Sequence, residues 1–190
     1  MKSFFELVVK DLISKVVFEK TFFIIPNRRS KVFLKKEILK SIKNTTLSPQ
    51  ILSIDDFIEL ISEMNESPKT TQIFSLYEAY MKVSKKKDFE SYNLFRNWSN
   101  MLLDDINDVD MSLAKSNDVF KYLFEIQKLQ TFSQEEGKTK LEFWKMIPQI
   151  VNEFKQILQK KDNANKGLCH LLAKENINLF SNSHSDNSFI

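Results

Sequence analysis

The chain has 190 residues with a formal net charge of +3, and 42% of its residues are hydrophobic. This length predicts one domain, or a domain with an appendage, and this hydrophobic content excludes wholesale disorder. The two glycines, Gly137 and Gly167, lie too far apart for a phosphate-binding loop or a dinucleotide fingerprint, so we expect no cofactor.

The first part of the chain alternates between helical and strand patterns. Residues 3–15 carry apolar side chains at helical spacing, and Ser3 is the expected N-cap. The run 21–25 (TFFII), which is stopped by Pro26, predicts a buried strand, and the run 50–54 (QILSI) predicts a second one. A helical stretch separates these runs, so the two strands are expected to pair in parallel.

Helical periodicity continues through the rest of the chain. Asp55 and Asp56 follow the second strand and are expected to cap a helix over 57–64. The other expected helices cover residues 30–43, 70–83, 92–106, 119–129, 141–158 and 168–180. The predicted fold class is therefore α/β but mostly helical, with a small parallel strand pair. Since two short strands do not form an independent sheet, either the helices carry the core or the α/β part belongs to something larger.

Three parts of the chain differ in pattern. Residues 1–66 form the α/β segment, residues 67–180 are expected to form a helical subdomain, and residues 181–190 are polar and serine-rich. The last part is expected to be disordered. Pro148 lies within the helix predicted for 141–158 and predicts a kink there.

Several function classes are disfavoured by what the chain lacks. Cys169 is the single cysteine, so an intrachain disulfide is excluded and a zinc site is not expected. The acidic run 104–110 lacks the glycine and the closing glutamate of an EF-hand loop, so we interpret it as a helix end and expect no metal. No catalytic constellation is present. The longest apolar run is far shorter than the ~20 residues of a membrane span, and the cytoplasm is the expected compartment.

The candidate site follows the first strand, where two of the three arginines occur in a chain with 25 lysines. The C-terminal edge of an α/β sheet is a usual ligand position, and a helix N-terminus offers N–H groups to a phosphate. The candidate phosphate-binding residues are Asn27, Arg28, Arg29, Ser30, Lys31 and Lys35, with Lys36 beside them. The alternative, which the residues alone slightly favour, is an ordinary helix start with a solvated basic face.

The basic side chains of the chain are concentrated in the part that contains this candidate site. Residues 1–48 hold eleven basic and four acidic side chains, and residues 49–66 hold five acidic and no basic ones. Lysine bias explains most of the overall charge. Trp98 and Trp144 lie at helical spacing among apolar residues, which is typical of core anchors rather than base-stacking platforms. Lys85–Lys87 is interpreted as a solvated loop.

Four segments in order resemble the N-terminal region of a known family. They are SFFELVVKDLISK…TFFIIPNRRSKVFLKKEI, PQILSIDDFI, IFSLYEAY and FRNWSNMLLDDINDVD, and together they span roughly residues 3–110. The combination is similar to Bacteroidetes-type PD-(D/E)XK nuclease family proteins, which resemble the AddB/RexB subunit of bacterial helicase–nucleases. A fainter similarity continues through EFWKMIPQIVNEFKQIL and KGLCHLLAKENI.

The resemblance implies a superfamily-1 helicase-like N-terminal half, often without a working ATP site, in a much longer protein with a C-terminal nuclease domain. Such proteins act in double-strand-break processing and recombinational repair. In helicases of this class the segment after the second core strand contacts single-stranded DNA, and Asn27, Arg28 and Arg29 match it by position. The stretch 102–110 matches the start of an inserted helical subdomain without an implied catalytic role.

The chain stops before any nuclease motif and leaves the family pattern after Phe180, so we expect a truncated or split-gene product, or an N-terminal fragment, without nuclease or ATPase activity. The expected function is a non-catalytic helicase-like fragment that contacts single-stranded DNA phosphates without sequence preference. The alternative is a helical interaction module that docks on the remainder of the nuclease protein or on a helicase subunit. No membrane partner is expected.

Overall fold

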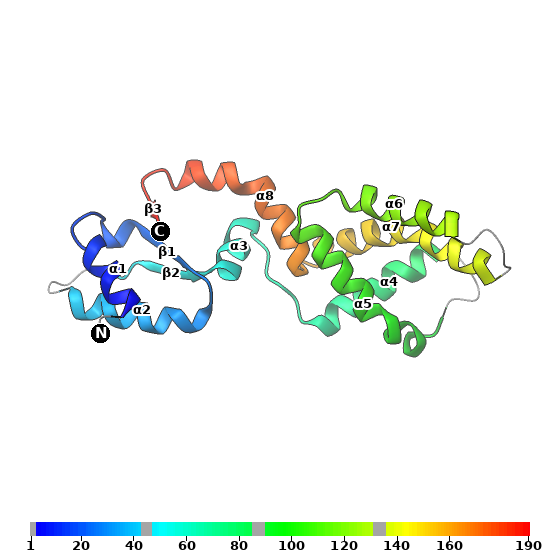
Figure 1. The fold of residues 1–190 in the computed structure, drawn as a ribbon, viewed down its shortest axis with the longest axis horizontal. Helices are drawn as coiled ribbons and strands as arrows, with labels where there is room; N and C mark the ends of the chain where they lie inside the picture. The colour runs from blue at the N-terminus through cyan, green and yellow to red at the C-terminus, as the bar shows by residue number, and fades with distance from the viewer. Residues whose placement is uncertain (1–2, 43–46, 85–89, 131–135) are drawn as a thin grey trace. The chain divides into compact units, whose positions relative to one another are not determined.

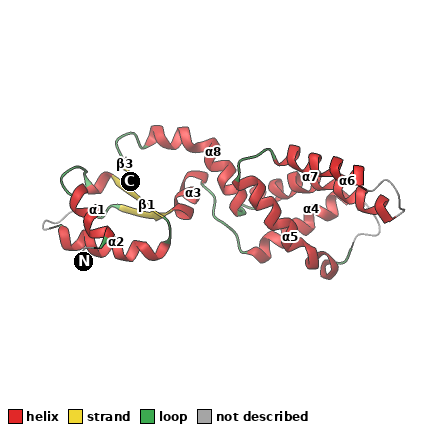
Figure 2. Ribbon diagram, viewed as in Figure 1, coloured by secondary structure: helices red, strands yellow, loops and turns green. Residues whose placement is uncertain are grey.

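The structure is a computed structural model that describes residues 3–42, 47–84, 90–130 and 136–190. Within these ranges it describes all side chains except those of residues 129–130 and 136–141. The described residues are mostly helical, with eight α-helices and a three-stranded parallel sheet near the N-terminus (Figure 2), which confirms the predicted fold class. The chain divides into two compact units, Met1–Ile61 with Glu175–Ile190, and Ser62–Lys174. The first unit thus takes in the end of the chain, which the predicted three-part division had kept apart.

The first unit is a small α/β layer structure built around β1 (Figure 1). Its elements are α1 (Phe4–Leu12), η1 (Phe18–Lys20), β1 (Thr21–Ile25), α2 (Arg28–Ser41), β2 (Gln50–Ser53), α3 (Ile54–Ser62), the last part of α8 (Lys166–Ser183) and β3 (Ser188–Phe189). Ser3 caps α1, since its Oγ accepts a hydrogen bond from the Glu6 N–H at 3.2 Å. β1 and β2 pair in parallel, with Ile25 opposite Ser53, as the sequence predicts.

The two faces of β1 contribute to separate apolar groups, because successive side chains on a strand point to opposite sides. Phe23 and Ile25 join a buried cluster with residues of α1, α2, η1 and β2, namely Val9, Phe18, Leu34, Ile38 and Ile51. Phe22 packs instead with aromatic rings from the end of the chain, at 6.3 Å from Phe180 and 5.5 Å from His184. Burial of these side chains explains why so short a strand run is stable here.

The expectation of a disordered tail over 181–190 was wrong. α8 continues to Ser183, and Ser188–Phe189 forms β3, which pairs in parallel with β1 and gives the sheet order β2-β1-β3. The Ile24 N–H donates to the Ile190 carbonyl at 2.8 Å, and the Phe189 ring stacks on Phe22 at 5.0 Å. Hydrogen bonds to the free edge of β1 and packing against its apolar side chains therefore order the tail despite its polar composition.

The start of α3 also differs from the prediction. The helix begins at Ile54 rather than at Phe57, so Asp55 and Asp56 lie in its first turn instead of capping it. Ser53 performs the capping: its Oγ accepts from the Asp56 N–H at 3.1 Å, while Asp56 Oδ2 accepts from the Ser53 N–H at 3.3 Å. This reciprocal pair is a capping box, which satisfies two backbone donors at the strand–helix junction.

The second unit is a helical bundle, made of α4 (Lys69–Ser84), α5 (Tyr92–Met111), α6 (Ser116–Gln130), α7 (Glu136–Lys160) and the first part of α8. α7 packs against both α4 and α6, and α5 packs against the same two helices. The largest fully buried apolar side chains here are Leu76, Phe95, Leu103, Ile106, Ile150, Phe154 and Leu158. Pro148 lies inside α7, which is longer than predicted, and the expected kink stays a prediction.

The acidic run 104–110 ends α5, as interpreted from the sequence, and its last residue is fully buried. Asp110 Oδ1 accepts hydrogen bonds from Ser116 Oγ and from Lys155 Nζ, each at 2.6 Å. Gly167 packs so closely on this residue that an added Cβ would lie 2.6 Å from Asp110 Cβ. A buried ion pair and one close backbone approach thus join α5, α6, α7 and α8 within this unit.

Candidate nucleic-acid interface

The candidate site begins where the chain leaves β1 and enters α2. Asn27 caps this helix: its Oδ1 accepts from the Ser30 N–H at 3.0 Å and from Ser30 Oγ at 3.2 Å. Both side chains were candidate phosphate ligands. Because they bond to each other, their role in the structure is to fix the helix start.

Arg28 is an exposed residue whose guanidinium faces Asp56 of α3. Its Nη2 and Nε lie 2.6 Å and 2.9 Å from Asp56 Oδ1. Burial acts to raise the pKa of the Asp56 carboxyl, but hydrogen bonds from Ser53 and Arg28 outweigh it and lower that pKa below its ordinary value. The hydrogen bond and the charge of Asp56 in turn raise the pKa of Arg28. Arg28 therefore carries a partly neutralised charge, and its pairing with Asp56 is a feature of the site that the sequence did not predict.

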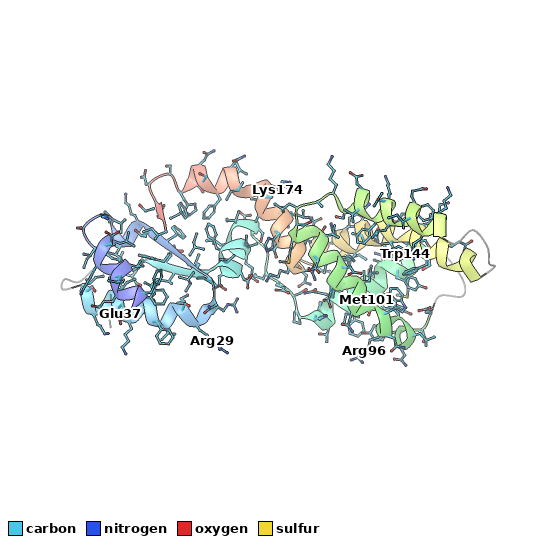
Figure 3. All side chains as sticks on the ribbon, viewed as in Figure 1. Arg29, Glu37, Arg96, Met101, Trp144 and Lys174 are labelled. Carbon is cyan, nitrogen blue, oxygen red and sulfur yellow. The ribbon has the colours of Figure 1, made fainter. Side chains whose placement is uncertain are left out.

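Five other cations of α2 are exposed, and one of them, Lys40, pairs with Glu37 at 2.8 Å. We call the remaining four the basic face: Arg29, Lys31, Lys35 and Lys36. The buried side of the helix is set by Leu34 and Ile38, which pack toward the sheet. Figure 3 shows Arg29 projecting away from the strands. Among the described residues, no carboxylate lies within ion-pair distance of these four side chains.

Two apolar side chains lie among these cations. Val32 is 69% exposed and Leu39 is 68% exposed, at positions where a helix buried only on its sheet side presents residues to solvent. They line a shallow groove of about 630 Å³ together with Lys31, Lys35, Lys36 and Lys40. The arrangement places ammonium groups that can bind anions beside exposed aliphatic surface.

Other sequence candidates have structural roles or lie elsewhere. Trp98 packs on Phe95 at 4.6 Å and on Phe143 at 5.0 Å, and its Nε1 donates a hydrogen bond to Glu90 Oε2 at 2.9 Å. Both Trp98 and Trp144 are only half-buried, so the expectation of core anchors is too strong for either residue. Cys169 is buried. Lys85–Lys87 lies outside the described residues.

No group of three or more His, Cys, Asp or Glu side chains that could hold a metal ion is found in the described part of the chain. None of the described helices is long and apolar enough to cross a membrane. The ammonium and guanidinium groups of α2 give the candidate site an electrostatic chemistry.

The chain matches no protein-family model, no curated protein and no solved structure. The resemblance to the PD-(D/E)XK nuclease family accordingly stays a prediction. What the site can do is argued below from the basic face and its surroundings.

Proposed function

We propose that the basic face of α2 binds the phosphate backbone of single-stranded DNA, as a non-catalytic helicase-like module of a DNA-repair and recombination nuclease protein in the cytoplasm. The observation that carries the proposal is the set of four exposed cations without a carboxylate partner among the described residues. Arg29 and Lys36 are seven residues apart on the helix, or about 10 Å along its axis. Each of the four cations can contact a phosphate, which gives up to four phosphate contacts along one strand.

The composition of the basic face favours binding without sequence preference. Three of its four cations are lysines, whose ammonium groups act as point charges rather than as the planar forks that read base edges. Arg28, which could form such a fork, is held by Asp56. Contacts of this kind position a strand and weaken steeply as salt rises.

The test compares two sets of lysine substitutions by fluorescence anisotropy with a labelled single-stranded oligonucleotide at low salt. Replacing Lys31, Lys35 and Lys36 together by glutamine should weaken binding at least tenfold, because three phosphate contacts are lost. The matched control replaces three exposed lysines outside α2 by glutamine, namely Lys115, Lys160 and Lys174. Equal affinity of the two triple variants, or no binding by the unmodified chain, would contradict the proposal.

A second candidate function rests on the apolar side chains of the same helix. Val32, Leu39 and Phe33 are all more than half exposed, which is typical of a surface that docks on a protein. The partner would be the remainder of the nuclease protein or a helicase subunit. Replacing Val32 and Leu39 by serine should then abolish co-purification with that partner while leaving affinity for single-stranded DNA unchanged.

A further inference from the structure

The second unit contains a groove between α6 and α7 that the proposed function does not use. Its volume is about 600 Å³, which is the size of a small-ligand site. Residues of both helices line it: Asn117, Lys121, Phe124 and Glu125 from α6, and Trp144, Lys145, Pro148, Gln149 and Asn152 from α7. Figure 3 labels Trp144 on α7, beside α6.

Aromatic surface forms the apolar part of this groove. Trp144 and Phe124 are both half-buried, so part of each side chain stays accessible to a ligand. Pro148 has no N–H, and the carbonyl of Trp144 one turn earlier in α7 therefore lacks its usual helical donor. A planar ligand with an amino group could stack on the indole and donate to that carbonyl.

The polar residues of the groove suit a ligand that combines a base with a phosphate. Lys121 and Lys145 are exposed cations from the two facing helices. The lining contains one acid, Glu125, which lies 3.8 Å from Lys128 of the same helix, so the two cations of the lining outnumber it. The lining also includes three side-chain amides, which can donate to and accept from base edges.

We infer that this groove binds a nucleobase together with its phosphate, the base on Trp144 and the phosphate at Lys121 and Lys145. Two ligands carry a base with a phosphate: single-stranded nucleic acid and a free mononucleotide. The first of these rests on the proposed function. A peptide is a weaker fit, because two cations and three amides surround an aromatic surface whose flat shape matches a base.

Quenching of tryptophan fluorescence by added nucleotide tests the inference on the full chain. Adenosine monophosphate and a single-stranded deoxyadenosine oligonucleotide serve as the two probes, and the signal that remains in Trp144→Leu reports the contribution of the half-buried Trp98. Trp144→Leu should abolish the quenching and weaken ligand binding about fivefold or more, the usual effect of losing one stacked base. The matched control is Tyr122→Leu, an exposed aromatic of α6 that lies outside the groove lining.

The outcomes separate the sources and the two functions. Quenching by the oligonucleotide alone assigns the groove to a polymer, and quenching by adenosine monophosphate alone assigns it to a free nucleotide. Quenching by both probes shows that the groove accepts the same nucleotide unit from either source. Oligonucleotide binding that depends on the basic face but is equal in Trp144→Leu and Tyr122→Leu would overturn only this inference. Quenching by a tryptophan-free apolar peptide but by neither probe would also overturn it.

A second variant keeps the test decisive if Trp144→Leu does not fold. Lys121→Gln with Lys145→Gln leaves the aromatic surface intact and removes both cations of the lining. This pair should weaken binding of the quenching probe at least threefold relative to Lys115→Gln with Lys160→Gln, which removes the same charge elsewhere. Equal affinity of the two pairs would contradict the assignment of the phosphate.

Discussion

Lys155→Met removes the cation that faces a fully buried carboxylate in the second unit. Lys155 Nζ lies 2.6 Å from Asp110 Oδ1, and the two side chains are 15% and 0% exposed. Asp110 Oδ2 has no hydrogen-bond partner among the described residues. After the substitution, the carboxylate would keep the hydrogen bond from Ser116 Oγ and would have no neutralising charge.

The expected loss is a large share of the stability of a small protein. Removing one partner of a buried ion pair costs about 3–5 kcal/mol, because the other charge stays buried and uncompensated. Since Lys155 retains some exposure and Ser116 still donates to Asp110, we expect a value of about 3 kcal/mol, at the low end of that range. The free energy of unfolding of such a chain is about 5–15 kcal/mol in total.

Urea denaturation followed by circular dichroism measures this loss. The slope of the free energy of unfolding against urea concentration should stay unchanged. The control is Lys160→Met, which removes an exposed lysine near the end of the same helix and should change stability by less than about 0.5 kcal/mol. Asp110→Leu combined with Lys155→Met should recover much of the loss, since no buried charge remains. A loss below about 1 kcal/mol for Lys155→Met alone would refute the reasoning.

Three further predictions follow from other contacts. Gly167→Ala should lower the free energy of unfolding by about 1–3 kcal/mol in the same assay, because its Cβ would overlap Asp110 Cβ; an unchanged value would show that α8 shifts freely. The folded-state pKa of Asp56 lies below its unfolded value near 3.8, so its stabilising contribution is present above that value and is lost as pH falls through the folded pKa. Thermal melts between pH 2.5 and 7 should therefore show a shallower acid loss for Asp56→Asn, and identical profiles would contradict this. Phe189→Ala should speed hydrogen exchange of the Ile24 amide, which donates to Ile190, whereas unchanged exchange would mean that the ring stack does not hold β3.

Elements with strong local signals could be predicted from the sequence. The strand 21–25 is rich in β-branched and aromatic residues and is closed by Pro26, and the structure gives it the same bounds. The parallel pairing follows from a helix placed between two strands. Ser3 was also identified as a cap because capping depends on neighbours three residues away.

Features that depend on distant contacts were missed. Arg28 and Asp56 pair because each lies three residues beyond the matched strand ends Ile25 and Ser53, a relation that needs the register of the sheet. The pairing of the tail with β1 brings together residues more than 160 positions apart, which no local pattern reports. The groove at Trp144 likewise depends on how two helices pack, so helical periodicity predicted burial and could not predict the half-exposed ring.

The salt dependence of single-stranded DNA binding tests the central claim most directly. With four phosphate contacts from the basic face, the logarithm of the association constant should fall with the logarithm of salt with a slope of about −2.8, or about 50-fold between 50 and 200 mM. Replacing Lys31, Lys35 and Lys36 by glutamine should reduce that slope to about −0.7. A slope that is the same in this variant and in the Lys115, Lys160 and Lys174 control would show that the basic face does not contact the phosphates.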